Sequence, residues 1–200
     1  MRVLQRRGLL AGAGSILLAG PAQAAEFRYR DWRFDCERVG ELKPALVDSV
    51  KAQVDIVESL NIKPQIKEFF RGVPCLFDLK TTGGPGAYSF DRDRMILSLE
   101  PQPKDNPVFL HELLHAYHDQ RLPGGRQNAK LRSLYEAAKA KGDFPPQAYM
   151  LTNPGEYFAM CASVVLWGQA ARPPRTRANV RQRLPETYAW IVEEFGLQLA

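Results

Sequence analysis

The chain of 200 residues has few cysteines and no long apolar segment beyond its N-terminus, and both shortages limit what it can be. It contains three cysteines and no CxxC pattern, which argues against a cysteine zinc site and against a small disulfide-rich scaffold. After residue 24, no apolar run approaches the roughly 20 residues that a membrane-spanning helix needs. The sequence therefore predicts a globular protein with no integral membrane segment in its mature part.

Positive charge is also scarcer than the total indicates. The formal net charge is +5, but three of the 27 basic residues stand in the first 24 positions, which hold no acidic residue. The rest of the chain carries 24 basic against 22 acidic residues, and this balance does not favour nucleic-acid binding. A hydrophobic content of 45% is typical of an ordinary globular domain.

Residues 1–24 have the three parts of a bacterial export signal. A basic start precedes a short apolar stretch over 9–20, and Ala22–Ala24 forms a small-x-small cleavage site. The pair Arg6–Arg7, followed by Gly-Leu-Leu, is typical of the twin-arginine route, although an ordinary secretory signal is the alternative. We therefore expect a periplasmic or secreted protein with a single domain at 25–200.

Export would place the cysteines in an oxidising compartment. Three cysteines allow one disulfide and leave one thiol over. Cys161 lies in an apolar stretch with helical spacing and reads as a buried core residue. We therefore favour a Cys36–Cys75 pairing, although the sequence alone does not choose among the three possible pairs.

The pattern of elements predicts an α+β fold with a small sheet and a mostly helical C-terminal part. Asn106 and Asn153 each precede a proline, which is typical of an N-cap followed by the first residue of a helix. We expect strands over 27–36, 73–79 and 94–99, the last two joined as a hairpin through the turn at 83–86, and helices over 42–60, 107–121, 129–141, 154–167 and from 180 or 185 to 195. The basic segment 172–183 favours a solvated loop, with contact to an anionic polymer or lipid as the alternative.

All three histidines stand in one stretch of eight residues, 111–118, inside the helix expected at 107–121. His111, Glu112 and His115 form an HExxH motif, and residues four apart share one helix face, so both imidazoles can reach one Zn²⁺. Glu112 then lies beside the metal, where it can hold a water molecule and accept its proton. The opposite face is apolar and can be buried; it holds Leu110, Leu113, Leu114 and Tyr117.

The motif leaves a third protein ligand to be found. The metzincin class places a histidine six residues after His115, where this chain has Arg121. His118 lies almost two helical turns from His111, which is poor geometry for one small ion, so we expect it to contact a ligand or substrate or to be exposed. Glu156 opens the later capped helix and is the better candidate, although an acidic residue there also stabilises the helix dipole.

HELLH followed about 40 residues later by NPGEYFA resembles the gluzincin metallopeptidases, and more narrowly the catalytic domain of anthrax lethal factor and its bacterial relatives. The resemblance covers roughly residues 94–167. It implies a zincin-like fold, with His111, His115 and Glu156 as zinc ligands and Glu112 as the general base.

The resemblance also implies roles around these ligands. Tyr149 stands seven residues before Glu156, where the family has a tyrosine that stabilises the oxyanion; a packed loop aromatic is the alternative. Strand 94–99 would be the edge strand that pairs with an extended peptide substrate, although a plain core strand fits equally well. Where the family has an acidic residue that orients the first histidine, this chain has Met160, so the partner of His111 stays open.

Together these features predict an exported zinc-dependent peptidase that acts on peptide or protein substrates. A catalytically inactive exported zinc-binding or partner-binding protein is one alternative, and a zinc amidase that acts on cell-wall crosslinks is another. The intact Glu112 favours an enzyme, because zinc binding alone does not require that residue.

Overall fold

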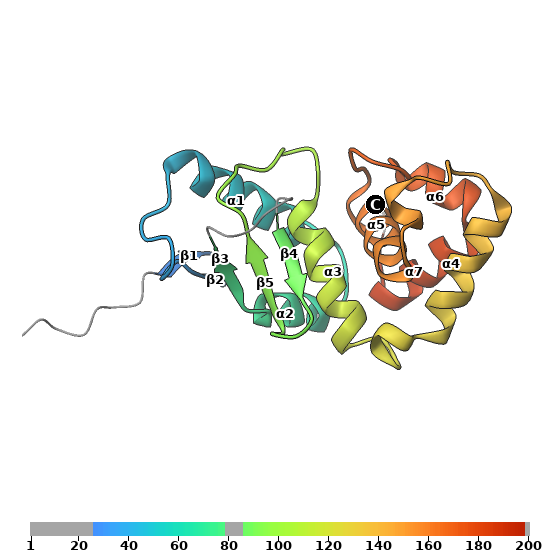
Figure 1. The fold of residues 1–200 in the computed structure, drawn as a ribbon, viewed down its shortest axis with the longest axis horizontal. Coiled ribbons are helices and arrows are strands. Elements are labelled where there is room, and N and C mark those ends of the chain that lie inside the picture. The colour runs from blue at the N-terminus through green and yellow to red at the C-terminus, as the bar shows by residue number, and fades with distance from the viewer. Residues whose placement is uncertain (1–25, 79–85, 199–200) are drawn as a thin grey trace, which may run out of the picture.

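The computed structural model describes residues 26–78 and 86–198, and Figure 1 shows a mixed sheet in one half and a group of helices in the other. The long helix α3 lies between the two halves. The strands are β1 (Glu26–Tyr29), β2 (Trp32–Asp35), β3 (Cys75–Phe77), β4 (Gly86–Ser89) and β5 (Arg94–Leu97). The helices are α1 (Pro44–Glu58), α2 (Pro64–Gly72), α3 (Val108–Gln120), α4 (Ala129–Lys141), α5 (Pro154–Trp167), α6 (Arg177–Arg183) and α7 (Pro185–Phe195), with short 3-10 turns η1 (Gly125–Gln127) and η2 (Tyr149–Leu151). The predicted α+β class is confirmed.

The five strands form one sheet in the order β1-β2-β3-β5-β4. The three central strands run parallel, and β1 and β4 are antiparallel edge strands. The single strand predicted over 27–36 is in fact the hairpin of β1 and β2. The chain turns at Arg30 and Asp31, and Arg30 takes a left-handed φ of 50°.

The hairpin predicted between 73–79 and 94–99 is wrong. β3 and β5 run parallel, and β5 pairs antiparallel with β4, which the sequence pattern did not predict. The predicted turn at 83–86 lies mostly outside the described residues, but its last residue, Gly86, begins β4. The four residues of β4 lack the run of β-branched and aromatic side chains that marks a strand in sequence. This extra strand moves β5 into the sheet interior and leaves β4 at the edge.

The helices agree better with the predicted pattern. Asn153 caps α5 as expected, because its Oδ1 accepts the N–H of Glu156 at 2.9 Å. Asn106 does not cap α3; its side chain instead accepts the N–H of Ala171 at 3.3 Å, from the loop after α5. The helix α2 was missed, because only Ile66 and Phe70 are buried among its nine residues and so little periodicity is visible.

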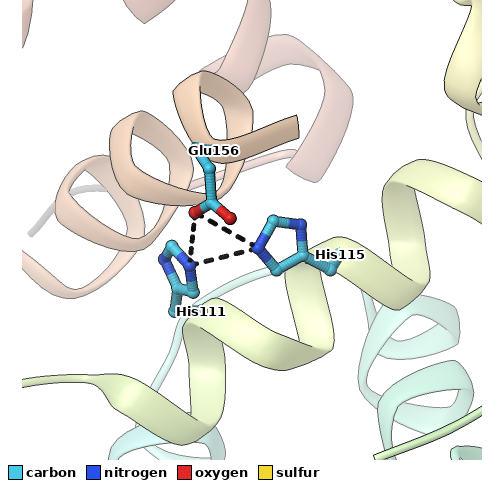
Figure 2. Close-up of side chains that lie close together, drawn as sticks. All are labelled: His111, His115 and Glu156. Carbon is cyan, nitrogen blue, oxygen red and sulfur yellow. Dashed lines mark hydrogen bonds and ion pairs between the residues drawn. The ribbon is translucent and has the colours of Figure 1, made fainter. Parts of the chain in front are cut away.

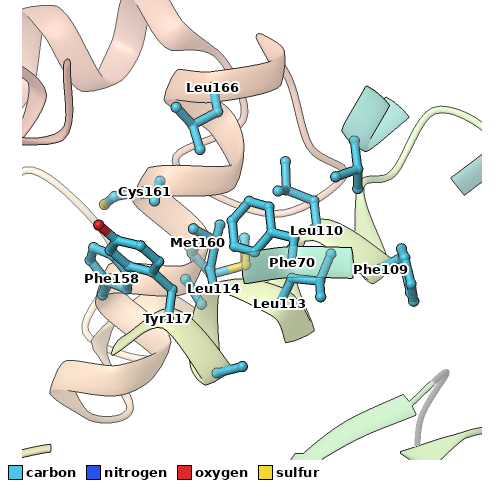
Figure 3. Packing of buried hydrophobic residues seen from close by; sticks show 14 of the residues in the cluster. Phe70, Phe109, Leu110, Leu113, Leu114, Tyr117, Phe158, Met160, Cys161 and Leu166 are labelled. Atoms are coloured by element: carbon cyan, nitrogen blue, oxygen red, sulfur yellow. The ribbon is translucent and has the colours of Figure 1, made fainter. Parts of the chain in front are cut away.

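The core is centred on α3 and α5, which pack against each other between the sheet and the C-terminal helices. Figure 3 shows Leu114 and Tyr117 of α3 close to Met160 and Phe158 of α5, while Leu113 lies on the side of Phe70. The apolar face predicted for α3 is buried, and so are three of its polar residues, Glu112, His115 and His118. Because both helices are surrounded by packed side chains, the polar groups that they carry are held in fixed positions.

The structure contradicts the favoured disulfide. All three cysteines are free and buried. Cys75 pairs in register with Phe34, so Cys36 is two residues further along the neighbouring strand, which places the two Cα atoms about 8 Å apart, beyond disulfide reach. The Cys36 and Cys75 thiols instead donate to the main-chain oxygens two residues before them, those of Phe34 and Val73.

The basic segment 172–183 is more ordered than a solvated loop. Its second half is α6, and the Arg177 guanidinium donates hydrogen bonds to the carbonyl oxygens of Val165 and Leu166 at the end of α5. Within the described residues, no helix is both long and apolar enough to cross a membrane. The predicted signal at 1–24 lies outside the described part of the chain.

Candidate active site

Two buried helices bring His111, His115 and Glu156 together, as Figure 2 shows. The histidines stand one turn apart on α3, and Glu156 comes from the first turn of α5. The Nε2 atoms of the two histidines are 3.1 Å apart. Glu156 Oε2 lies 3.1 Å from His111 Nε2 and 3.5 Å from His115 Nε2.

These separations fit one tetrahedral zinc ion. Zinc binds histidine nitrogen at about 2.0–2.1 Å and carboxylate oxygen at about 2.0–2.2 Å, so neighbouring tetrahedral ligands lie about 3.3–3.5 Å apart. The three observed separations of 3.1, 3.1 and 3.5 Å match this spacing closely. Two imidazoles and one carboxylate are also the donor set of a catalytic zinc site that keeps its fourth position open.

Gly155 lies where the first turn of α5 meets the histidines of α3. A Cβ atom at Gly155 would lie 3.1 Å from Asn153 Oδ1, and 3.6 and 3.7 Å from the Nδ1 atoms of His118 and His115. A Cβ there would therefore crowd the Asn153 cap of α5, whereas its contacts with the two histidines would be at ordinary van der Waals distance. A glycine inside a first helical turn, where its propensity is poor, is the sequence signal of this close contact.

The surroundings of Glu112 and Glu156 shift the pKa values of the two carboxyl groups in opposite directions. Burial alone would raise the pKa of Glu156, but hydrogen bonds from His111 and His115 lower it well below its usual range. Burial raises the pKa of Glu112, and the nearby histidines only partly oppose that shift. Glu112 also accepts a hydrogen bond from the main-chain N–H of Tyr88 at 2.9 Å. The HExxH glutamate is therefore tied directly to the edge strand β4.

Tyr149 lies beside the cluster in the turn η2. Its ring centroid is 6.3 Å from that of His111, and its side chain is 39% exposed. Partial burial, followed by the negative charge of Glu156, raises the pKa of Tyr149 to about 12, so its hydroxyl stays protonated. The guanidinium of Arg172 lies over the same ring, 5.0 Å from its centroid.

A cavity of about 360 Å³ opens next to these side chains. Its lining includes His111 and Glu112 of α3, Tyr149 of η2, Met160 of α5 and Arg172 of the loop that follows. Met160 therefore borders the cavity beside His111 and supplies no carboxylate to it. The edge strand contributes Gly86 to the lining.

His118 does not join the cluster. It is 3% exposed, and its ring packs 5.7 Å from that of Phe158, so the expectation of an exposed histidine is wrong. Burial, together with the nearby His115 and Arg126, lowers the pKa of His118 to about 4. The side chain is therefore neutral and belongs to the packing between α3 and α5.

Sequence reasoning missed three contributors to the cavity region. The N–H of Tyr88 and the main chain of Gly86 come from an unpredicted strand, and Arg172 was read as part of a solvated segment. Main-chain groups leave no signal in a sequence. Arg172 is one of several arginines in its segment, and the sequence does not distinguish it from the others.

The comparison with solved structures agrees with this architecture. No protein-family model matches the chain, and no curated protein sequence matches it either. The structure of the Pro-Pro endopeptidase PPEP-2 from Paenibacillus alvei is similar, with a TM-score of 0.54 over 78% of this chain and 95% of that one. This chain shares its fold with a peptidase. At 19% sequence identity the similarity concerns the fold alone.

Proposed function

We propose that this protein is an exported zinc-dependent peptidase with a zincin-like fold of the gluzincin type. His111, His115 and Glu156 are its metal ligands, Glu112 is its general base, and Tyr149 stabilises the oxyanion. The observation that carries the proposal is the cluster of three ligand atoms at 3.1–3.5 Å, with Glu112 and His111 lining the adjoining cavity. The shared fold of a Pro-Pro endopeptidase supports a peptidase over other zinc proteins.

The chain's own residues are arranged for hydrolysis. Zinc bound at this site would supply a water of lowered pKa and polarise the substrate carbonyl. Glu112 accepts a proton on the carboxylate that faces the cavity, and the Tyr88 N–H holds that carboxylate in place. The protonated hydroxyl of Tyr149, on the His111 side, donates a hydrogen bond to the developing oxyanion.

The substrate backbone binds along β4. The strand proposed for this role from sequence, 94–99, is an interior strand, so it has no free edge. The Met95 N–H donates to the Pro74 carbonyl, so the main-chain polar groups of Met95 face β3. Those of the next residue, Ile96, therefore face Ala87 of β4. In an antiparallel pair the main chain alternates in direction, so Gly86 faces away from the sheet, into the cavity. An extended peptide can pair with that edge.

The first experiment measures bound zinc in the purified protein and in three variants. We expect one zinc per chain in the wild type and in Glu112→Gln, and loss of most zinc in His115→Ala and Glu156→Ala, since each removes a ligand. Unchanged zinc content in Glu156→Ala would move the third ligand elsewhere. A wild-type protein that takes up no added zinc would end the proposal.

The second experiment measures peptide hydrolysis by mass spectrometry, with a random peptide mixture, Pro-Pro peptides and purified cell wall as substrates. We expect the wild type to cleave peptides and Glu112→Gln to lose at least a hundredfold in rate while it keeps its zinc. Products from cell wall alone would identify an amidase. A zinc-loaded wild type that cleaves nothing would identify an inactive binding protein.

Export has a separate test. N-terminal sequencing of the protein from the periplasmic fraction should give Ala25 as the first residue. Replacement of Arg6 and Arg7 by lysine should retain the precursor in the cytoplasm if the twin-arginine route is used. Normal export of that double variant would point to the ordinary secretory route.

A further inference from the structure

We propose that Arg172 is a specificity-determining residue, which binds a carboxylate of the substrate at the end of the cavity beside Tyr149. The inference rests on the proposed peptidase function and deepens it. It names the substrate class: peptides with an acidic side chain, or a free C-terminal carboxylate, near the bond that is cleaved.

Arg172 is placed to meet the substrate. It lines the same cavity as His111 and Glu112. Its guanidinium carbon lies 5.0 Å from the centre of the Tyr149 ring, which in turn lies 6.3 Å from the His111 ring. The Arg172 guanidinium is thus at most about 11 Å from the His111 ring, a span of about three residues of an extended peptide.

The backbone that carries Arg172 is held in place. The loop between α5 and α6 closes through a bridge between Gln169 and Thr176 and through the N–H of Ala170, which donates to the Arg175 carbonyl at 2.8 Å. The Arg175 N–H in turn donates to the carbonyl of Arg172 at 3.0 Å. A fixed loop presents its arginine without a large loss of conformational freedom on binding.

The same loop is joined to the metal-binding helix. The Asn106 side chain, just before α3, accepts the N–H of Ala171 at 3.3 Å. This contact uses the asparagine that the sequence presents as a helix cap, and it connects the position of Arg172 with that of His111. The distance from the arginine to the cluster is therefore set by the fold and not by the side chain alone.

The charge of Arg172 is not neutralised within the described part of the chain. No ion pair there involves Arg172, and the nearby carboxylate of Glu156 is held between two histidines. Arg126, at the other end of the cluster, also lies over an aromatic ring, that of Phe90, at 4.4 Å. Arg126 has an acidic neighbour, Asp119: burial raises the pKa of Asp119, and Arg126 opposes that shift. Of these two arginines, Arg172 is the one that lines the cavity with His111 and Glu112.

The pairing of the Arg172 guanidinium with the Tyr149 ring favours a carboxylate as the bound group. A guanidinium presents N–H donors around a flat edge whose shape matches two carboxylate oxygens, and an aromatic ring below one face leaves that edge accessible. Gln102 and Asn106 line the same cavity and add polar groups. A cationic side chain among polar neighbours discriminates against neutral and basic groups.

The test compares wild type, Arg172→Gln, Arg172→Lys and two control variants on peptide libraries with one fixed position. One library has free C-termini and the other has amidated C-termini. Arg126→Gln removes the same charge at the opposite end of the cluster, and Arg181→Gln removes it from exposed surface on α6. Binding of matched peptides with Glu or Gln at the selected position is measured in parallel on the zinc-loaded Glu112→Gln protein, with and without Arg172→Gln.

We expect the wild type to prefer an acidic group at one position by about tenfold in both cleavage and binding, the scale of a hydrogen-bonded charge in a partly exposed site. Arg172→Gln should remove that preference, Arg172→Lys should keep part of it, and both controls should keep it. A preference that disappears on amidation identifies the C-terminal carboxylate, and one that persists identifies an acidic side chain. An Arg172→Gln protein with the wild-type preference, or a wild type with no preference for acidic groups, overturns the inference. Selective binding of acidic peptides that requires Arg172, without any cleavage, would instead keep the carboxylate site and reject the peptidase function.

Discussion

Tyr149 illustrates how far a single residue can be understood from its neighbours. Its ring lies between the His111 imidazole and the Arg172 guanidinium. The pKa of its hydroxyl is raised to about 12. In the proposed mechanism the two parts of the side chain have separate roles: the ring supports Arg172, and the hydroxyl serves as a hydrogen-bond donor. Substitution can separate the two.

We predict that Tyr149→Phe lowers kcat by about tenfold to a thousandfold, the usual cost of one lost oxyanion donor, and leaves KM close to the wild-type value. Steady-state kinetics on the best library peptide measures both constants. Because phenylalanine keeps the ring under Arg172, the preference for acidic peptides should remain. An unchanged kcat would reduce Tyr149 to a packed aromatic.

At the residue scale, the sequence predicted what depends on local spacing. The pair His111 and His115 needs only the four-residue repeat of a helix, so the motif was sufficient. Glu156 comes together with them through a contact between two helices; its place in the first turn of a capped helix made it a candidate, and the resemblance added weight. Arg172 depends on how a loop folds back over η2, which no spacing within the chain encodes.

At the scale of secondary-structure elements, the Glu58 side chain connects α1, β2 and α2. It stands at the end of α1 and accepts hydrogen bonds from Trp32 Nε1 of β2 at 2.8 Å and from Arg71 of α2 at 2.6 and 2.9 Å. The hydrogen bonds from Arg71, aided by that from Trp32, lower the pKa of Glu58 against the opposite effect of burial. This carboxylate fixes the helix that sequence analysis missed against the sheet.

We predict that Glu58→Gln destabilises the protein by about 2 kcal/mol near neutral pH, the range for a hydrogen bond to a charged group. A carboxyl whose folded pKa is lowered stabilises the fold above its unfolded pKa, and that stabilisation is lost as pH falls through the folded value. The difference between wild type and variant should therefore shrink below about pH 4. Denaturant unfolding at several pH values measures it.

Asp55→Asn is the matched control for this change. Asp55 lies on the same helix and forms an ion pair with Arg30, but both side chains are about half exposed. An exposed pair contributes about 0–1 kcal/mol, so the control should be nearly neutral. Equal decreases in the free energy of unfolding in the two variants would mean that the burial of Glu58 adds nothing to the contribution of its hydrogen bonds.

The errors in the predicted sheet have one physical origin. Long amphipathic helices show a clear period, so α1, α3, α4 and α5 were predicted within a few residues. The strands have only three or four residues each, too few for alternation to show, and their pairing joins segments far apart in sequence. As a result β4 was missed, and β5 was assigned to the edge.

On the scale of the whole molecule, the candidate metal site joins the two halves of the fold. Its histidines belong to the helix that packs against the sheet, and Glu156 belongs to the helical half. An ion that binds all three side chains binds only when both halves are folded and in contact. Metal binding should therefore stabilise the complete molecule and not one half of it.

We predict that zinc raises the free energy of unfolding by about 4 kcal/mol when its free concentration is a thousand times the dissociation constant, with a corresponding rise in Tm. A chelator should reverse the rise. Thermal unfolding followed by circular dichroism, with and without zinc, measures the change in one cooperative transition. Two separate transitions, of which only one responds to zinc, would show that the site does not couple the halves.

Glu156→Ala should lose most of this zinc-dependent rise, and Glu186→Ala provides the comparison that isolates the reason. Both glutamates stand in the first turn of a helix, α5 and α7 respectively, so both stabilise a helix dipole. Only Glu156 lies within reach of the histidines. A dipole role predicts that both variants lower stability equally without zinc and respond equally to it. A ligand role predicts that Glu186→Ala keeps the full zinc response, because the metal connects α3 to α5 through Glu156 and not through charge at a helix end.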